Sequence, residues 1–262
     1  MPEGDSIAKN ASRLRSVLAG KEIVSVYGTA PSIRTNSRRL VGQTVEALRT
    51  VGKHLLIDVS GGFSVRVHLG MPGRWRILTA DGRVPGSARL VLSTLSHHAC
   101  CFSAPTVEVD RTPAIDEWLA RLGPDPLDPN FQARDLVERA RTRSRRPIAE
   151  VLLDQRVMAG LGNVYKSEVL FLAGIHPRTP VEQIGDDEFV EIADRARQLM
   201  SINVRAGPRV TTGYPTPGRE TLVYGRAGKP CRRCASAVAE DRLGGRITYW
   251  CPTCQPSIKP GP

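Results

Sequence analysis

Hydrophobic residues recur along this chain first with a helical spacing, then with a strand-like spacing, and then again with a helical one. The first segment, 6–19, predicts an amphipathic helix because its apolar residues fall three or four positions apart. These apolar positions are Ile7, Ala11, Leu14 and Leu18. Asp5 or Ser6 can accept hydrogen bonds from the unpaired N–H groups at the start of this helix, so we expect one of them to cap it.

Between 22 and 109, short runs rich in β-branched and aromatic residues alternate with Gly, Pro, Asn and Asp. Two runs are less distinct, and the five clear ones are 23–27, 55–59, 64–68, 75–78 and 89–95. Several short strands separated by turn residues are typical of a β-sandwich. A further helix is expected over 114–122, where Gly123 and Pro124 end it.

The rest of the chain returns to helical spacing, with predicted helices at 131–143, 148–155, 164–173 and 186–203. A loop rich in Gly, Pro and Thr follows at 207–219. The predicted fold class is therefore α+β with several domains. They are an N-terminal β-sandwich with flanking helices (1–123), a linker (124–130), a helical domain (131–222), a four-cysteine ribbon (223–256) and a tail (257–262).

Four cysteines near the C-terminus form two Cys-x2-Cys pairs, Cys231 with Cys234 and Cys251 with Cys254. This spacing is typical of a zinc ribbon, in which two short strands lie between the pairs. Four thiolates complete a tetrahedral structural Zn²⁺ site and leave no open position for catalysis. We therefore expect one structural zinc ion; two disulfides, free thiols or an iron–sulfur cluster are the alternatives.

The chain carries a formal net charge of +11, and most of it lies near the C-terminus. From Arg205 onward there are ten Lys and Arg residues against three acids, a net +7 in 58 residues. A basic zinc module is typical of proteins that bind the nucleic-acid backbone, with a solvated basic surface as the alternative. The N-terminus lacks the pattern of a signal peptide and no apolar run is long enough to span a membrane, so we expect a reducing cytoplasm.

Two short segments indicate chemistry. Between two predicted helices, Gly160 and Gly162 precede Asn163, which we expect to cap the next helix. The start of that helix offers unpaired N–H groups to a phosphate, unless the segment is an ordinary helix hairpin. At the other end of the chain, removal of the initiator methionine would expose Pro2 as a secondary amine beside the Glu3 carboxylate. Such an amine can attack an electrophilic carbon, and the carboxylate can move a proton.

Together these segments resemble the formamidopyrimidine-DNA glycosylase/endonuclease VIII family of base-excision repair enzymes over nearly the whole chain. The start Met1-Pro2-Glu3-Gly4 is similar to the catalytic N-terminus of the endonuclease VIII branch. The segment Gly160-Leu-Gly-Asn163-Val-Tyr-Lys-Ser-Glu resembles the family's helix–two-turn–helix. Further matching segments are Gly52-Lys53-His54 (a strand-borne catalytic lysine), His68-Leu-Gly-Met71 (a void-filling side chain), Arg121-Leu-Gly-Pro-Asp-Pro-Leu (a linker near DNA) and the zinc finger with Arg246 at its tip.

The resemblance implies a bifunctional DNA glycosylase and AP lyase that acts on damaged DNA. Pro2 would attack C1′ of the damaged nucleotide, and Glu3 would assist ring opening and proton transfers. Lys53 and Arg246 would bind the phosphates beside the lesion together with Gly162 and Asn163, and β- and then δ-elimination would follow. Met71 would fill the hole left by the flipped base, unless it is a core residue, and Arg121 would lie near DNA.

Three departures from the family pattern bear on the substrate. Ser6 stands where many relatives have Glu, and Asp5 is the nearest acid. The segment 100–105 lacks the Arg-Phe pair that the formamidopyrimidine branch inserts, and the loop 207–219 is short. The last two, together with the Glu3-Gly4 start, favour an endonuclease VIII-like enzyme that acts on oxidised pyrimidines. An 8-oxoguanine or formamidopyrimidine glycosylase and a non-catalytic zinc-ribbon nucleic-acid-binding protein are the alternatives. We expect a monomer in the bacterial cytoplasm, associated with the nucleoid, and a structural strand rather than a second metal site around His98 and Cys100.

Overall fold

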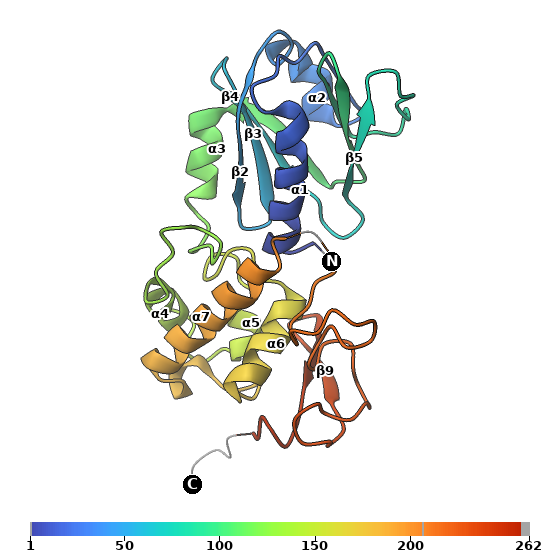
Figure 1. Cartoon of the computed structure of the whole chain (residues 1–262). Coiled ribbons are helices and arrows are strands. Elements are labelled where there is room, and N and C mark those ends of the chain that lie inside the picture. The colour runs from blue at the N-terminus through green and yellow to red at the C-terminus, as the bar shows by residue number, and fades with distance from the viewer. Residues whose placement is uncertain (1, 206, 258–262) are drawn as a thin grey trace. The chain divides into compact units, whose positions relative to one another are not determined.

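The computed structural model describes residues 2–205 and 207–257, and the chain divides into two compact units, Met1–Arg121 and Leu122–Pro262 (Figure 1). The predicted tail lies outside the described residues from position 258 onward. Within the described residues, no helix is long and apolar enough to cross a membrane.

The first unit contains two antiparallel sheets of four strands each. One sheet has the order β1 (Ser25–Tyr27), β6 (Leu90–Ser93), β7 (His97–Phe102) and β5 (Arg74–Thr79). The other has the order β2 (Val45–Val51), β3 (His54–Val59), β4 (Phe63–His68) and β8 (Thr106–Arg111). Each of the five clear predicted runs contains a strand. Within the described residues this unit has three further strands, β2, β7 and β8, whereas two further strands were predicted.

The core of this unit lies between the sheets and includes helix α1 (Gly4–Leu18), which runs beside β2 and β3 (Figure 1). The apolar stripe of α1 packs against alternate residues of the strands, among them Leu55, Val67 and Leu92. Two short helices, α2 (Pro31–Asn36) and η1 (Ser37–Arg39), connect the sheets, and α3 (Thr112–Leu119) contacts β4 and β8. The β-sandwich with flanking helices is confirmed.

Helix α1 begins earlier in the sequence than was predicted. Glu3 is the N-cap residue, and its carbonyl accepts the Ser6 and Ile7 amides at 2.9 and 3.1 Å. Asp5 lies inside the first turn and is buried, and the Ser6 hydroxyl donates to the Asp5 carboxylate at 3.3 Å. The prediction of Asp5 or Ser6 as the cap was therefore wrong, because the backbone turns into the helix directly after Glu3.

The second unit contains the helices α4 (Asp135–Arg141), α5 (Ile148–Val151), α6 (Asn163–Ala173), η2 (Val181–Gln183) and α7 (Asp186–Ile202). Two of them are shorter than predicted. The start of the predicted helix 131–143 is not helical, because Arg197 binds the carbonyl of Phe131 at 3.1 Å. The end of 148–155 leaves the helix because the Gln155 side chain bonds the Gly160 amide and the Leu161 carbonyl of the following turn at 3.0 Å each.

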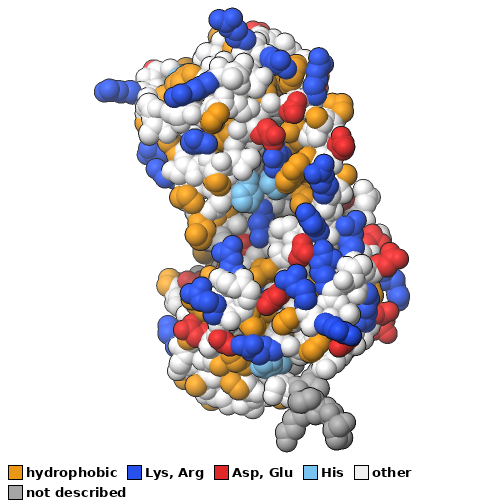
Figure 2. Space-filling model, turned by 180° about the vertical axis from the view of Figure 1, so that it is seen from behind, with side chains coloured by type: hydrophobic (Ala, Val, Ile, Leu, Met, Phe, Trp, Pro, Cys, Tyr) orange, Lys and Arg blue, Asp and Glu red, His pale blue; other side chains and the backbone are white. Residues whose placement is uncertain are grey.

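The C-terminal ribbon consists of the antiparallel hairpin β9 (Ala239–Leu243) and β10 (Arg246–Trp250), as the cysteine spacing predicted. A small apolar cluster of Phe171, Val223 and Val238 with Cys231 and Cys251 joins the ribbon to α6. Side chains of Lys and Arg are spread over both units on the face that Figure 2 shows, where acidic side chains are fewer. This surface charge is consistent with a polyanionic partner.

Candidate active site and zinc site

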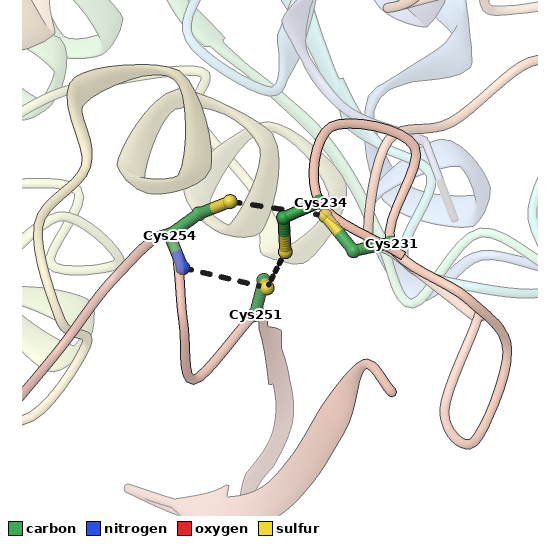
Figure 3. A group of neighbouring side chains, drawn as sticks. All are labelled: Cys231, Cys234, Cys251 and Cys254. Atoms are coloured by element: carbon green, nitrogen blue, oxygen red, sulfur yellow. Dashed lines mark hydrogen bonds between the residues drawn. The ribbon is translucent and has the colours of Figure 1, made fainter. Parts of the chain in front are cut away.

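The four ribbon cysteines converge on one point (Figure 3). Their sulfur atoms all lie within 4.8 Å of one another, with 3.9 Å between Cys231 and Cys254 and 3.4 Å between Cys234 and Cys251. A tetrahedral zinc ion with Zn–S bonds of about 2.3 Å requires sulfur separations of about 3.8 Å. All six cysteines of the chain are free thiols, which contradicts the disulfide alternative. The residues therefore fit one structural Zn²⁺.

The thiols differ in how readily they ionise before a metal binds. Hydrogen bonds from Ser236 lower the pKa of Cys234 to about 6. Burial, with the neighbouring thiols, raises the pKa of Cys254 to about 12. Since zinc binds thiolates, metal binding must release protons from the less acidic thiols, and zinc affinity falls as pH falls.

Pro2 and Glu3 stand directly ahead of α1 in the first unit. Pro2 is half-buried, and the Glu3 side chain is fully buried. The N-terminus of a helix carries a partial positive charge, which favours a carboxylate and disfavours a protonated amine beside it. Both groups therefore lie at the positive end of the α1 dipole.

Lys53 lies in the turn Gly52-Lys53 between β2 and β3, one residue ahead of the strand that was expected to carry it. Gly52 has φ +58°, a left-handed conformation that suits glycine in this turn. Two histidines lie next to the turn on adjacent strands, with the ring centroids of His54 and His68 4.9 Å apart. Lys53 is half-buried beside them.

The environment of His54 keeps its ring neutral. The Arg66 guanidinium lies 3.8 Å from the centre of the Trp118 ring, and its Nη1 is 3.4 Å from His54 Nδ1. Burial, followed by the charges of His68, Arg66 and Lys53, lowers the pKa of His54 to about 3. The pKa of His68 is lowered for the same reasons, first by burial and then by Lys53 and Arg66. The positive charge next to these rings therefore resides on Lys53 and Arg66.

Met71 lies in the turn between β4 and β5, and its side chain is 71% exposed. This exposure contradicts the alternative that Met71 packs in the core. Gly70 has φ +58°, and a Cβ atom there would lie 2.9 Å from the Pro105 side chain, so the turn is held against the β7–β8 loop. Arg121 is exposed at the end of the first unit.

In the second unit, α6 begins at Asn163, and Gly162 rather than Asn163 is its N-cap residue. The predicted capping role of Asn163 was wrong, because its Nδ2 instead donates to the Ile247 carbonyl of β10 at 2.7 Å. Asn163 Oδ1 is buried and has no hydrogen-bond partner within the described residues. Gly160 has φ +84°, which suits the tight turn ahead of the helix. The structure thus joins Asn163 to the hairpin that carries Arg246.

Arg246 is exposed at the tip of that hairpin, directly after the turn Gly244-Gly245. Both glycines have positive φ, 53° and 76°, as a two-residue hairpin turn requires. The residue opposite Arg246 is Leu243, whose side chain belongs to the core of the helical domain. The fingertip therefore rests on the helices of its own unit.

Two buried charged residues of α6 were not predicted from the sequence. Lys166 is fully buried, and its Nζ donates to Thr248 Oγ1 of β10 at 2.7 Å. Glu168 is also fully buried and accepts the backbone amides of Leu222, Val223 and Tyr224 at 2.7 to 2.9 Å. The signal was present as two charges within the otherwise apolar run 164–173, since buried charges require partners. Both residues tie the zinc ribbon and the segment before it to the helix.

The predicted residues divide between the two units. Pro2, Glu3, Lys53, Met71 and Arg121 belong to the first unit, and Gly162, Asn163, Arg246 and the four cysteines belong to the second. Within the described residues, the four ribbon cysteines are the one group of three or more close metal-binding side chains. His98 and Cys100 lie on strand β7. His98 contacts the Ser93 hydroxyl at 2.8 Å.

Comparison with known families gives three matches that together span most of the chain. They are the formamidopyrimidine-DNA glycosylase N-terminal domain (residues 1–106), the formamidopyrimidine-DNA glycosylase H2TH domain (122–213) and the zinc finger found in FPG and IleRS (228–256). The last of these agrees with the zinc geometry of the four cysteines and not with an iron–sulfur cluster.

Individual relatives match over the full length. The chain is 41% identical over 257 residues to the DNA-(apurinic or apyrimidinic site) lyase Nei2 of Mycolicibacterium smegmatis, covering 97% of this chain and 99% of the relative. It is 38% identical to a probable endonuclease 8 2 of Streptomyces coelicolor, covering 100% and 97%. The Lactococcus lactis Fpg in complex with an N7-benzyl-Fapy-dG-containing DNA superimposes with a TM-score of 0.86 at 26% identity, covering 98% and 100%. The chain therefore belongs to the formamidopyrimidine-DNA glycosylase/endonuclease VIII family.

Proposed function

We propose that this protein is a bifunctional DNA glycosylase and AP lyase of base excision repair, with Pro2 as its nucleophile. The observation that carries the proposal is the Pro2-Glu3 pair directly ahead of α1, in a chain 41% identical to a protein named as an AP lyase. A non-catalytic DNA-binding protein with the same ribbon has no need of an N-terminal proline beside a buried carboxylate.

The proposed reaction begins when the Pro2 nitrogen lone pair forms a bond to C1′ of the damaged nucleotide. The glycosidic bond breaks, the base leaves with its electron pair and a proton, and Glu3 moves protons as the sugar ring opens to an iminium ion. Loss of a C2′ proton then expels the 3′ phosphate, and a second elimination expels the 5′ phosphate. Hydrolysis of the iminium releases Pro2 and the sugar fragment.

Phosphate binding supports both eliminations, because each leaving group is a phosphate. The Arg246 guanidinium can bind a phosphate through its positive charge. One N–H of Asn163 Nδ2 donates to the Ile247 carbonyl, and its second N–H is left to donate to a phosphate. Gly162 permits close approach of the DNA backbone to the start of α6. Lys53 is assigned to the phosphate nearest the sugar, Arg121 to the backbone near the linker, and Met71 to the space that the flipped nucleotide leaves.

We assign the lesion class to oxidised pyrimidines. The short loop 207–219 and the absence of an Arg-Phe pair in 100–105 support this choice over a purine-specific enzyme. One chain carries the nucleophile, the helical domain and the zinc ribbon, so we propose a monomer as the working unit. Damaged chromosomal DNA as substrate and six reduced cysteines are consistent with the cytoplasm and its nucleoid.

Borohydride trapping on duplex DNA with an abasic site tests the nucleophile. The wild-type protein should form a trapped complex, whereas a variant with residues retained ahead of Pro2 should form none, because its Pro2 nitrogen is an amide. The matched control carries the same extension at the C-terminus and should trap normally. Full trapping by the N-terminally extended protein would disprove the mechanism.

The role of Glu3 needs a separate measurement. Glu3→Gln keeps the shape of the side chain but loses its proton transfer, so base excision should fall by roughly 10²–10⁴-fold. Affinity for DNA with an uncleavable abasic analogue should stay within about twofold of wild type, since a buried carboxylate supplies no phosphate contact. Equal losses in binding and excision would instead assign Glu3 a structural role.

A further inference from the structure

A hollow of about 340 Å³ lies beside the fingertip, between the hairpin and α5 in the second unit. Two arginines, Arg146 and Arg246, line it together with two acids, Glu150 and Asp154. Leu153, Leu243 and Gly244 complete its lining. An arginine assigned to a DNA phosphate therefore shares a hollow with two carboxylates that could hold it.

Each of these carboxylates is paired with a different arginine. Arg146 Nη2 lies 3.0 Å from Glu150 Oε2, and Arg143 Nε lies 2.7 Å from Asp154 Oδ2. Within the described residues, the Arg246 side chain has no hydrogen bond or ion pair. The guanidinium at the fingertip thus keeps its charge available although two acids lie nearby.

Glu150 also contacts the turn that carries Arg246. A Cβ atom on Gly244 would lie 3.0 Å from Glu150 Cγ and 3.2 Å from its Cδ, so the side chain lies directly against this glycine. Its side chain is 22% exposed, whereas that of Arg146 is 51% exposed. On the far side of Arg246, the Ile247 carbonyl is held by Asn163. The backbone on both sides of Arg246 is therefore braced by the helical domain.

We propose that Glu150 and Arg146 are positioning residues for Arg246. Glu150 supports the turn at Gly244 by packing against it. Arg146 forms an ion pair with the Glu150 carboxylate, so that Arg246 remains available to a DNA phosphate. The proposal rests on the proposed function only in that Arg246 contacts DNA. It assigns no direct phosphate contact to Arg146. An exposed arginine on a basic DNA-binding surface would otherwise be taken for such a contact.

Removal of the Arg146 charge should release Glu150 to pair with Arg246. The affinity of Arg146→Ala for duplex DNA with an uncleavable abasic analogue should fall about threefold to fivefold. This is the factor expected if DNA binding must first break an exposed ion pair between Glu150 and Arg246. The slope of log K against log salt should fall by up to about 0.9, because Arg246 leaves its phosphate. Adding Glu150→Gln should restore both affinity and slope, since glutamine keeps the packing on Gly244 but cannot hold a guanidinium by charge.

A second combination tests the same assignment from the other side. In an Arg246→Ala background, Arg146→Ala should cause less than about a twofold further loss, because the residue that it protects is already gone. A direct phosphate contact predicts the opposite result, with additive losses in affinity and slope and no rescue by Glu150→Gln. That outcome would overturn the proposal.

The pair Arg195 and Glu191 on α7 supplies a matched control. It is also an i, i+4 pair at 2.5 Å with both side chains partly exposed, but it does not line the hollow. Arg195→Ala should change affinity by less than about twofold, and Glu191→Gln should rescue nothing. Failure of the wild-type protein to bind abasic DNA in a salt-dependent way would count against the proposed function itself, whereas wild-type binding without rescue counts against the positioning role alone.

Discussion

Met71 is a large apolar side chain held in water by a short turn, with Gly70 packed on Pro105 behind it. An exposed methionine at a fixed position can enter a base stack without first rearranging the backbone, and its thioether chain adapts to an irregular gap. Met71 therefore has the exposure and the flexible shape that its proposed role requires, which is to fill the space left by a flipped nucleotide.

Met71→Ala should consequently weaken excision on duplex DNA by about tenfold or more, since unstacking a base step costs about a few kcal/mol, which an inserted apolar side chain offsets in part. The loss should be small on the same lesion in single-stranded DNA, where no stack needs support. Single-turnover excision on both substrates measures the difference. The salt slope of binding should remain that of wild type, and an equal loss on both substrates would assign the wedge to another residue.

The surroundings of His54 make the stability of the first unit depend on pH, because they lower the pKa of its ring. Its folded-state pKa of about 3 lies below the ordinary value of 6.5, so acid protonates the unfolded chain first. The stabilisation by the neutral ring is complete above about pH 6.5 and is lost as pH falls from 6.5 toward 3. Between pH 7.5 and pH 5, the free energy of unfolding of the first unit should fall by about 2 kcal/mol on account of His54.

Chemical denaturation of the full chain at these two pH values tests this. His54→Phe keeps a ring against Trp118 but cannot be protonated, so its pH dependence should be shallower than that of wild type by the same amount. His68 titrates in the same direction and stays in place, so some dependence should remain. An unchanged pH dependence in His54→Phe would mean that the ring is protonated as easily in the folded protein as in the unfolded one.

At the scale of secondary-structure elements, α6 connects the helical domain to the zinc ribbon through polar contacts that are fully buried. Lys166 and Glu168 are one turn or less apart on this helix, and they bind β10 and the 222–224 segment respectively. Charged groups in such surroundings specify one arrangement, because any displacement leaves a buried charge without partners. The helix thereby sets the position of the hairpin that carries Arg246.

Glu168→Ala should therefore destabilise the second unit by roughly 3–5 kcal/mol, since three backbone amides lose their acceptor. Glu168→Gln keeps one acceptor oxygen and should cost less, about 1–3 kcal/mol. Calorimetry of both variants measures the order of these losses. A loss for glutamine as large as that for alanine would show that the charge, and not the packing of the side chain, dominates.

At the scale of the whole molecule, two units with separate cores respond differently to the loss of zinc. The ribbon has a small apolar cluster, so the metal supplies much of its folding free energy, whereas the sandwich core does not involve the cysteines of the ribbon. Cys231→Ser, or a strong chelator, should lower the unfolding temperature of the second unit and leave that of the first unchanged.

Metal analysis and calorimetry on the same samples check this prediction, with about one zinc per chain expected for wild type. DNA binding should be lost together with the metal, since Arg246 is placed by the ribbon. Cys100→Ser is the matched control, because this buried cysteine lies in the first unit and should leave the zinc content unchanged. Normal DNA binding by metal-free protein would contradict the role given to the ribbon.

Much of this protein could be predicted from local patterns. The spacing of Cys231, Cys234, Cys251 and Cys254 determined a tetrahedral thiolate site, because two tight turns bring paired sulfurs together whatever the rest of the chain does. Alternating and helical hydrophobicity likewise determined the β-sandwich and most of the helices, since burial of one face is a local requirement. The segments around Pro2 and Arg246 indicated the family because a sequence motif is also a local pattern.

Only the tertiary structure decided contacts between residues far apart in the chain. Asn163 was expected to cap its own helix. Because the hairpin packs against α6, the Asn163 side-chain amide instead donates a hydrogen bond to the Ile247 carbonyl. Met71 is exposed rather than part of the core, and Arg246 shares a hollow with Glu150 almost a hundred positions earlier in the sequence. Local spacing encodes which atoms a segment can offer, whereas the partners of these atoms follow from how the elements pack, and that depends on the whole chain.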